Sequence, residues 1–177
     1  SNISFSQIDK IKRLIYLIAT SVPFTPNMSK LSQATSISRP TLNDYLYFLE
    51  RGDIISTLNY PGRGYKKLTK PDRIFLNNTN LMYAVSGSPD KGSERETFFV
   101  NQLKNYYNNK RTFIDDEKLM LDRKGDFLVE NRYIVEIGGK NKSFQQIKDI
   151  DNAFVIADDI VIGFKNKIPL WLYGFLY

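Results

Sequence analysis

Apolar residues in the first fifty positions recur at intervals of three and four residues, which is the spacing of amphipathic helices. They predict a first helix over residues 6–21 that ends before Pro23. A short second helix carries Leu31. A third helix begins after Ser38, a favoured N-cap, and ends at Gly52, a favoured C-cap.

The segment 30–50 resembles the helix-turn-helix of bacterial regulators. A Leu and an Ala face inward on the second helix, and the pattern Thr-Leu-x-x-Tyr-Leu-x-x-Leu follows on the third. Residues 54–59 and 65–69 then predict two strands joined by a turn at 60–64, as in a wing. We therefore expect a winged helix-turn-helix domain over residues 3–87.

The resemblance implies that the start of the third helix enters the major groove of DNA and that the wing contacts the phosphate backbone. The alternative is a winged helix used only for packing or protein contacts, because Asp44 and Tyr47 lie on the outer face of the third helix and Asp44 would repel phosphates. The residues expected to bind nucleic acid are Arg39, Thr41 and Asn43 on the helix and Arg63, Lys66 and Lys67 on the wing.

The run Ser86–Ser93 combines Gly, Ser, Pro and Asp, which predicts a loop and a domain boundary. A second domain is expected over residues 94–177. Its predicted elements are a helix over 94–107, a strand over 111–114, a helix over 145–150, two strands within 153–164, and a buried strand or contact segment in the apolar run 168–177.

Two β-rich runs flank the short segment Glu130–Arg132, which predicts a hairpin centred on Asn131 that pairs position 126 with position 136. Alternation then puts Asp126 and Glu136 on one face, about 5 Å apart at their Cβ atoms. Two carboxylates that close repel each other unless a cation lies between them, so the spacing predicts a magnesium or manganese site. The alternative is a pair of solvated carboxylates at strand ends with no metal.

An Asp followed about ten residues later by a Glu on a second strand resembles the PD-(D/E)XK, or restriction-endonuclease-like, fold. The resemblance implies that these two acids bind the metal, that Glu96 on the preceding helix adds a ligand, and that a Lys two residues after the Glu positions the attacking water. That position is Gly138 here, so Lys140 or Lys142 would have to reach the site from the Gly-Gly turn. We expect a remnant or weak site, with Glu96, Asp126, Glu136 and Lys140 as its catalytic set and the three acids as its metal ligands.

The composition narrows the chemistry of both domains. The 177 residues include neither His nor Cys, which excludes disulfides, imidazole or thiolate catalysis, and zinc sites built from these ligands. The net charge is +6; residues 1–70 carry ten basic and four acidic side chains, whereas residues 71–177 carry fifteen of each. A polyanionic partner such as DNA is therefore expected at the first domain.

The whole chain is similar to the C-terminal region of a family of bacterial and archaeal AAA-type P-loop ATPases, in which a winged helix precedes a nuclease-like domain of unknown function. The resemblance implies that an ATPase domain precedes Ser1, and the start without Met agrees with a trimmed chain. No Gly-x-x-x-x-Gly-Lys-Ser/Thr loop occurs here, so ATP would bind only through that missing domain. The segments that carry the similarity are Ile74–Ala84, Arg95–Phe99, Gly125–Val129, Val135–Lys142 and Ile168–Tyr177.

Together these patterns predict an α/β (α+β) chain: a winged helix-turn-helix followed by a small restriction-endonuclease-like domain with a central mixed sheet. We expect a non-catalytic accessory region that binds DNA, protein or both, with the ATPase domain of the same protein as a partner. The alternatives are a magnesium-dependent nuclease that uses the three acids and a purely protein-interacting domain. No apolar run is long enough to cross a membrane and no leader is evident, so a cytoplasmic location is expected.

Overall fold

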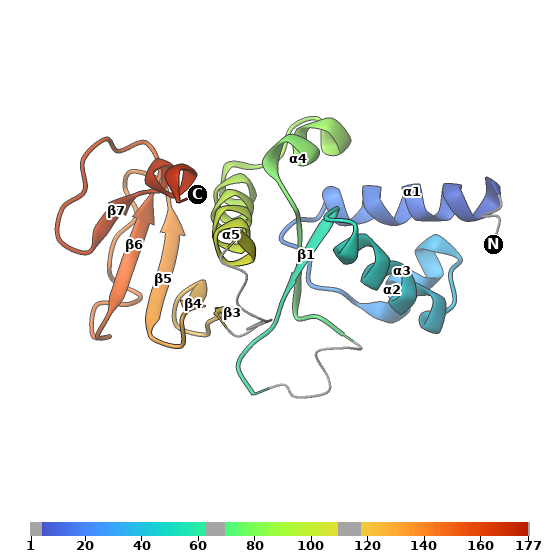
Figure 1. Ribbon diagram of the computed structural model, residues 1–177, viewed down its shortest axis with the longest axis horizontal. Coiled ribbons are helices and arrows are strands. Elements are labelled where there is room, and N and C mark those ends of the chain that lie inside the picture. The colour runs from blue at the N-terminus through green and yellow to red at the C-terminus, as the bar shows by residue number, and fades with distance from the viewer. Residues whose placement is uncertain (1–4, 63–69, 110–117, 177) are drawn as a thin grey trace. The chain divides into compact units, whose positions relative to one another are not determined.

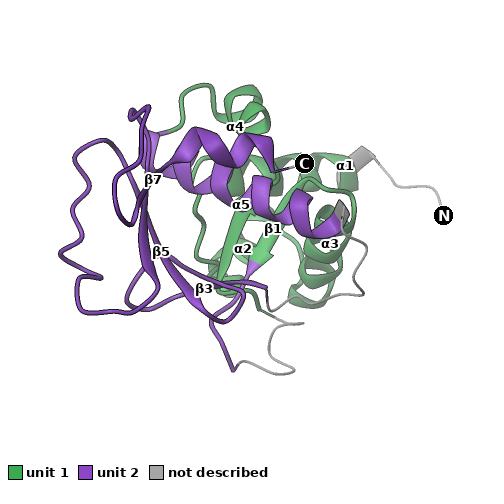
Figure 2. Cartoon of the chain, turned by 60° about the vertical axis from the view of Figure 1, so that its left-hand side comes forward, with its two compact units in different colours: residues 1–57, 63–89 green, residues 58–62, 90–177 purple. Residues whose placement is uncertain are grey.

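The structure is a computed structural model that describes residues 5–62, 70–109 and 118–176. It is a mixed α/β architecture, which confirms the fold class at that level. The chain divides into two compact units (Figure 2): a first unit of residues 1–57 and 63–89, and a second unit of residues 58–62 and 90–177. None of the helices in the described part of the chain is long and apolar enough to span a bilayer.

The first unit is a group of helices with a small two-stranded antiparallel sheet formed by β1 (Ile55–Leu58) and β2 (Arg73–Leu76). Its core consists of apolar side chains from α1, α3 and both strands, among them Leu14, Leu42 and Phe75. Its helices are α1 (Phe5–Ala19), α2 (Met28–Thr35), α3 (Arg39–Arg51) and α4 (Thr79–Ser86).

The three predicted N-terminal helices are confirmed, including the ends of the third. The Ser38 side chain accepts a hydrogen bond from the Thr41 N–H at 3.4 Å, which caps the start of α3, and Gly52 is its C-cap. The strand at β1 is also confirmed, but its partner among the described residues is β2, which was not predicted. The predicted return strand 65–69 lies outside the described residues.

The second unit contains one long helix, α5 (Lys91–Asn109), and a five-stranded mixed sheet with the order β3-β4-β5-β6-β7 (Figure 1). β3, β4 and β5 are antiparallel neighbours, whereas β5, β6 and β7 run parallel. The strands are β3 (Leu119–Leu121), β4 (Phe127–Val129), β5 (Tyr133–Gly138), β6 (Ala153–Ala157) and β7 (Lys167–Pro169), and a 3₁₀ helix, η2 (Leu170–Phe175), ends the described chain.

Side chains alternate between the two faces of this sheet, and other segments of the second unit cover both faces. α5 and η2 pack on the face that carries Val135 and Phe154. The opposite face carries Ile134 and Val155, which pack with Ile147 from the segment that follows β5. The sheet is therefore enclosed on both sides, as expected for strands that pair in parallel.

Several predicted elements of the second unit are wrong or differently placed. Residues 145–149 form consecutive turns rather than a helix, with i→i−3 bonds such as the 3.0 Å bond from the Ile147 N–H to the Phe144 carbonyl. Residues 161–163 form an exposed loop rather than a strand, and Ile162 is 84% exposed. The C-terminal apolar run supplies part of β7 and then η2, which contacts α5, so it matches the predicted contact segment rather than one buried strand.

The predicted loop between the domains is shorter than the sequence suggested. α4 ends at Ser86 and α5 begins at Lys91, because Asp90 caps α5 three residues earlier than expected. One Asp90 carboxylate oxygen accepts the N–H groups of Gly92 and Ser93, both at 3.0 Å. The predicted strand 111–114 lies outside the described residues.

Candidate functional site

The hairpin formed by β4 and β5 has the predicted register. Phe127 pairs with Val135 and Val129 with Tyr133, so the hairpin is centred on Asn131 as expected. Asp126 lies just before β4, and its carboxylate Oδ2 accepts the N–H of Ile137 at 2.7 Å. The Asp126 side chain thus continues the ladder beyond the last paired residue, which gives it a structural role in addition to any chemical one.

Glu136 lies on β5 with its side chain buried at 2% exposure. Its Oε1 forms an ion pair with the Nζ of Lys142, a side chain that is one-third exposed. Its Oε2 is buried and has no hydrogen-bond partner among the described residues. A buried carboxylate oxygen without a donor is costly, so this atom marks a place where a cation or another donor would be accommodated.

The local electrostatics raise the pKa of Glu136 above its ordinary value. Burial is the largest cause, and the nearby carboxylate of Asp126 acts in the same direction. The hydrogen bond and the charge of Lys142 oppose both, because they favour the ionised carboxylate. The two acids are therefore close enough to repel each other, and Lys142 supplies a positive charge that offsets that repulsion.

Gly138 explains how Lys142 reaches this carboxylate. A Cβ atom at position 138 would lie 2.6–2.7 Å from the Cβ, Cγ and Cδ atoms of Lys142, which is closer than such atoms approach. The absence of a side chain at 138 thus leaves room for the Lys142 stem to lie over the end of β5. A turn bond from the Lys142 N–H to the Gly139 carbonyl, 2.9 Å long, folds the chain back at this point.

Gly139 makes room for a second cation in the same way. A Cβ there would lie 3.2 Å from a terminal nitrogen of Arg95, whose guanidinium pairs with Asp158 at 3.0 Å. The Nζ of Lys167 donates to the carbonyls of Lys140 and Lys142, at 2.7 and 3.0 Å. Lys167 therefore binds the loop after β5 by two hydrogen bonds, and Arg95 lies close to its Gly139.

Lys140 and Glu96 were also predicted to belong to this site, but the structure does not place them as it places Lys142 beside Glu136. Lys140 is exposed, so the structure places Lys142 and not Lys140 on Glu136. Glu96 is half-buried on α5, which packs against the Val135 face, whereas alternation puts Glu136 on the Ile134 face. Within the described ranges, no three acidic side chains form a group that could hold a metal ion. The magnesium or manganese site stays a prediction.

The predicted DNA-contacting residues of the third helix lie in the first turn of α3 and just after it. Arg39 is exposed, and its guanidinium donates to the hydroxyl of Ser29. The Thr41 hydroxyl is half-buried and lies 2.8 Å from the hydroxyl of Ser38, and Asn43 is also half-buried. Arg63, Lys66 and Lys67 lie outside the described residues.

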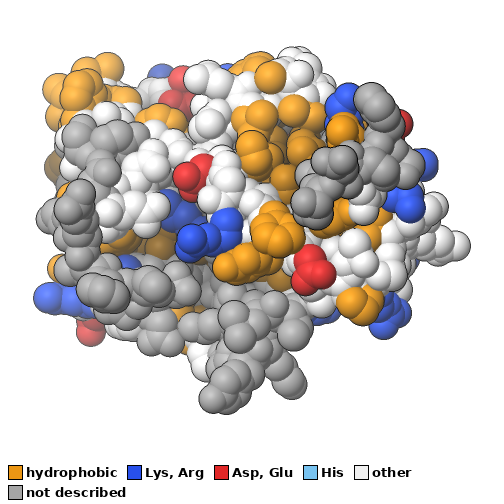
Figure 3. All heavy atoms as spheres, turned by 45° about the vertical axis from the view of Figure 1, so that its right-hand side comes forward, with side chains coloured by type: hydrophobic (Ala, Val, Ile, Leu, Met, Phe, Trp, Pro, Cys, Tyr) orange, Lys and Arg blue, Asp and Glu red, His pale blue; other side chains and the backbone are white. Residues whose placement is uncertain are grey.

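Further along, α3 exposes two aromatic rings: that of Tyr47, which was predicted on the outer face, and that of Phe48, which sequence patterning did not single out. Tyr47 and Phe48 are 58% and 64% exposed, with ring centroids 5.7 Å apart. On the face drawn in Figure 3, the coloured Lys and Arg side chains stand in several separate places between hydrophobic and uncharged ones. The visible basic side chains thus do not form one continuous patch on that face.

Comparison with known proteins adds no family to this picture. No protein-family model matches the chain, and neither a curated protein nor a solved structure matches it significantly. The similarity to the C-terminal region of ATPases and to restriction-endonuclease-like domains therefore remains an interpretation of the sequence.

Proposed function

We propose that this chain is a non-catalytic nucleic-acid-binding module, in which a helix-turn-helix unit contacts duplex DNA and a nuclease-like unit provides a stable scaffold. The observation that supports it most is the ion pair between Lys142 and the buried Glu136. A lysine ammonium there offsets the repulsion between two neighbouring carboxylates, which is the task expected of a divalent metal ion. In this proposal the Lys142 ammonium thus takes the place beside the two carboxylates that a divalent metal ion would take in a nuclease.

The capped first turn of α3 supports the DNA-binding part of the proposal. Ser38 fixes the start of the helix, and the exposed Arg39 extends from its first residue. Side chains in the first turn of a recognition helix are the ones that reach base edges or phosphates in the major groove. The excess of basic over acidic residues in positions 1–70 favours a polyanionic partner at the same unit.

A titration of labelled duplex DNA at several salt concentrations tests this part. We expect affinity to fall linearly with salt on a double-logarithmic plot and the Arg39→Ala variant to lower the slope by about one. Arg51→Ala is a matched control, because Arg51 is also exposed but lies at the other end of α3. Binding that is independent of salt and of Arg39 would contradict the proposal.

A second function, metal-dependent cleavage of DNA, is favoured by one specific observation. The Lys142 stem occupies the space of a side chain at position 138, so its ammonium lies beside Glu136 much as the lysine of an active PD-(D/E)XK site would. In that case Asp126 and Glu136 would hold a magnesium ion, and the unpartnered Oε2 of Glu136 fits an oxygen ligand. When bound, such an ion activates water and stabilises charge on the phosphate.

Cleavage and metal-binding assays separate the two functions. If the chain is a nuclease, magnesium or manganese supports cleavage that is lost in Asp126→Ala and in Lys142→Ala. If the internal cation replaces the metal, the unmodified protein shows neither cleavage nor a magnesium-induced rise in melting temperature. Lys142→Ala should then gain a magnesium-dependent rise, because the two carboxylates are left without their cation.

The resemblance also supports attachment to a P-loop ATPase domain, and we propose that domain as the protein partner of this chain. Coexpression with the coding sequence upstream of Ser1 would test it. A specific complex is expected, and failure of the two parts to co-purify would argue against it.

A further inference from the structure

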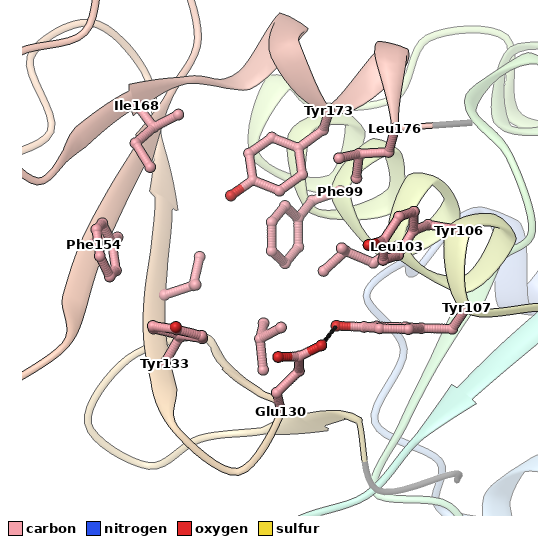
Figure 4. A pocket seen from close by; sticks show the side chains of 12 residues that line it. Phe99, Leu103, Tyr106, Tyr107, Glu130, Tyr133, Phe154, Ile168, Tyr173 and Leu176 are labelled. Atoms are coloured by element: carbon pink, nitrogen blue, oxygen red, sulfur yellow. Dashed lines mark hydrogen bonds between the residues drawn. The ribbon is translucent and has the colours of Figure 1, made fainter. Parts of the chain in front are cut away.

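The second unit contains a cavity of about 410 Å³ between α5, η2 and the Val135 face of the sheet (Figure 4). Its volume is within the range of small-molecule sites. It lies on the face opposite to the Ile134 face to which alternation assigns Glu136, so it is distinct from the carboxylate site described above. Six aromatic rings dominate its lining: Phe99, Tyr106, Tyr107, Tyr133, Phe154 and Tyr173.

Two polar groups enter this aromatic cavity from opposite sides. The hydroxyl of Tyr173 points into it and has no hydrogen bond among the described residues (Figure 4). Burial raises the pKa of Tyr173 to about 12, so the hydroxyl stays protonated and can donate. Across the cavity, the carboxylate of Glu130 accepts only a long bond, 3.4 Å, from the hydroxyl of Tyr107. Both groups have capacity left for a bound molecule.

Two basic side chains stand against rings of the same lining. The Nζ of Lys118 is 5.4 Å from the centroid of Tyr107, and the guanidinium carbon of Arg132 is 5.1 Å from that of Tyr133. These contacts keep positive charge next to the cavity although its one charged lining residue, within the described chain, is Glu130. A ligand that carries both N–H donors and a negative group would find complementary partners here.

We propose that this cavity binds the base of a nucleotide. A planar heteroaromatic base would stack on the rings, as bases do in single-strand-binding proteins. Its ring or exocyclic N–H groups would donate to Glu130, and a carbonyl or ring nitrogen would accept from the Tyr173 hydroxyl. The phosphate would lie toward Lys118 and Arg132.

Other small ligands match these groups less well. A quaternary ammonium ion would suit the rings and Glu130 but would leave the Tyr173 hydroxyl without an acceptor. A fatty acyl chain would bring no N–H donor to the carboxylate. Guanine fits best among the bases, because its neighbouring N1–H and N2–H groups can both donate to one carboxylate.

Nuclear magnetic resonance titration of the full chain with GMP, AMP, CMP and UMP tests the proposal, with ribose 5-phosphate and choline as controls. We expect the nucleotides to shift the signals of the cavity residues, GMP at the lowest concentration, and both controls to leave them unchanged. In a second titration the ligand is a short single-stranded oligonucleotide. Stronger binding of the oligonucleotide identifies the base as one of a strand, and stronger binding of GMP identifies a free nucleotide.

Two conservative variants make the test specific. Tyr173→Phe keeps the ring that packs on Phe99 at a centroid distance of 4.9 Å and removes only the hydroxyl. Glu130→Gln keeps the size of the side chain but removes its charge and replaces one acceptor oxygen with an NH2 donor. Each should weaken GMP binding about tenfold, as expected for loss of one good hydrogen bond. Tyr83→Phe, at an exposed position of α4, should bind like the unmodified protein.

The proposal would be overturned if no nucleotide or oligonucleotide bound at millimolar concentration, if choline bound more tightly than GMP, or if both variants bound GMP normally. It does not rest on duplex binding by the first unit. Arg39→Ala should leave GMP binding unchanged, so failure of one proposal is distinguishable from failure of the other.

Discussion

The first turn of α3 and the loop after β5 both present a basic side chain, but the two side chains have different surroundings. Arg39 is exposed and bonds to a neutral hydroxyl, so its charge is available to a partner. Lys142 bonds to a carboxylate that is 2% exposed, so much of its charge is offset inside the protein. The comparison shows that the number of basic residues does not predict a binding partner unless the acidic groups near each of them are known.

The contrast between an exposed Arg39 and an ion-paired Lys142 bears on how the charges of the whole sequence are distributed. Residues 71–177 contain equal numbers of basic and acidic side chains, and the structure pairs some of them, both across a long sequence distance and locally. Arg95 pairs with Asp158, 63 residues away, and Lys142 with Glu136. Some of the balanced charges of this part are thus paired near the loop after β5, whereas the basic excess in positions 1–70 includes the exposed Arg39.

The largest effect is expected from Lys142→Ala. Removal of the ammonium leaves a buried carboxylate without its cation, and breaking one side of such a pair typically costs about 3 kcal/mol. Urea unfolding followed by circular dichroism would measure the loss. Lys140→Ala is the matched control, because Lys140 is exposed two residues away, and it should change the free energy of unfolding by less than about 0.5 kcal/mol. Equal losses of stability in the two variants would contradict the claim that the Lys142 ammonium stabilises the buried carboxylate of Glu136.

A smaller but related loss is expected from Gly138→Ala. The added methyl group would lie 2.6 Å from the Lys142 stem, so the lysine must move or the strand must shift, at a cost of about 2 kcal/mol. Lys142→Ala removes the Cγ and Cδ atoms that the methyl group would meet but keeps the Cβ atom, so Gly138→Ala and Lys142→Ala should combine to less than the sum of their separate losses, with part of the Gly138→Ala loss remaining. A double-mutant cycle measures this coupling, and full additivity would show that Gly138 has no part in placing the lysine.

The pH dependence of stability probes the carboxylate itself. The pKa of Glu136 is raised in the folded protein, mainly by burial, so the folded state holds this proton to a higher pH than the unfolded chain does. The contribution of Glu136 to stability is therefore full below the unfolded pKa and is lost as the pH rises through the folded pKa. Glu136→Gln should remove that loss.

Unfolding free energies measured from pH 4 to pH 8 test this sign. The difference in stability between Glu136→Gln and the unmodified protein should move in favour of the variant as the pH rises. A difference that stays constant would mean that Lys142 lowers the pKa of Glu136 as much as burial and Asp126 raise it, and a difference that moves the other way would mean that Lys142 lowers it more.

The sequence predicts some of these features and not others for physical reasons. The register of the β4–β5 hairpin follows from a short turn centred on Asn131, and the start of α3 from the cap at Ser38, because both depend on neighbouring residues. β2 and β3 were missed because their side chains are almost all buried, so they show no alternation. Val161 and Ile162 favour a strand by propensity, yet they lie in an exposed loop.

The candidate site could likewise be predicted from the sequence only in part. That one of the lysines beyond Gly138 could reach Glu136 follows from the sequence, but the choice between Lys140 and Lys142 depends on how the Gly139 turn folds back. The side of the sheet on which Glu96 lies depends on the packing of α5, which no local pattern encodes. The aromatic cavity collects residues from α5, four strands or their ends, and η2, and no sequence spacing connects them.

The smallest effect is expected at the helix caps, where the two units differ in chemistry. Ser38 caps α3 with a neutral hydroxyl, whereas Asp90 caps α5 with a carboxylate that also accepts the Ser93 hydroxyl. That side-chain hydrogen bond, with those from the backbone, lowers the pKa of Asp90 below its usual value. Its stabilisation is therefore present above the unfolded pKa and is lost as the pH falls through the folded pKa.

Asp90→Asn keeps a good capping group and removes only its charge at the positive end of the helix, so we expect a loss of about 0.5 kcal/mol at pH 7. Thermal unfolding at pH 7 and at pH 3 should show a smaller difference at pH 3, because lowering the pH through the unfolded pKa begins to remove the stabilisation that the ionised Asp provides. Ser38→Ala is the comparison on α3, with a loss of about 1 kcal/mol that is the same at both pH values because the hydroxyl does not titrate. A pH-independent difference at Asp90 would show that its charge contributes nothing to the start of α5.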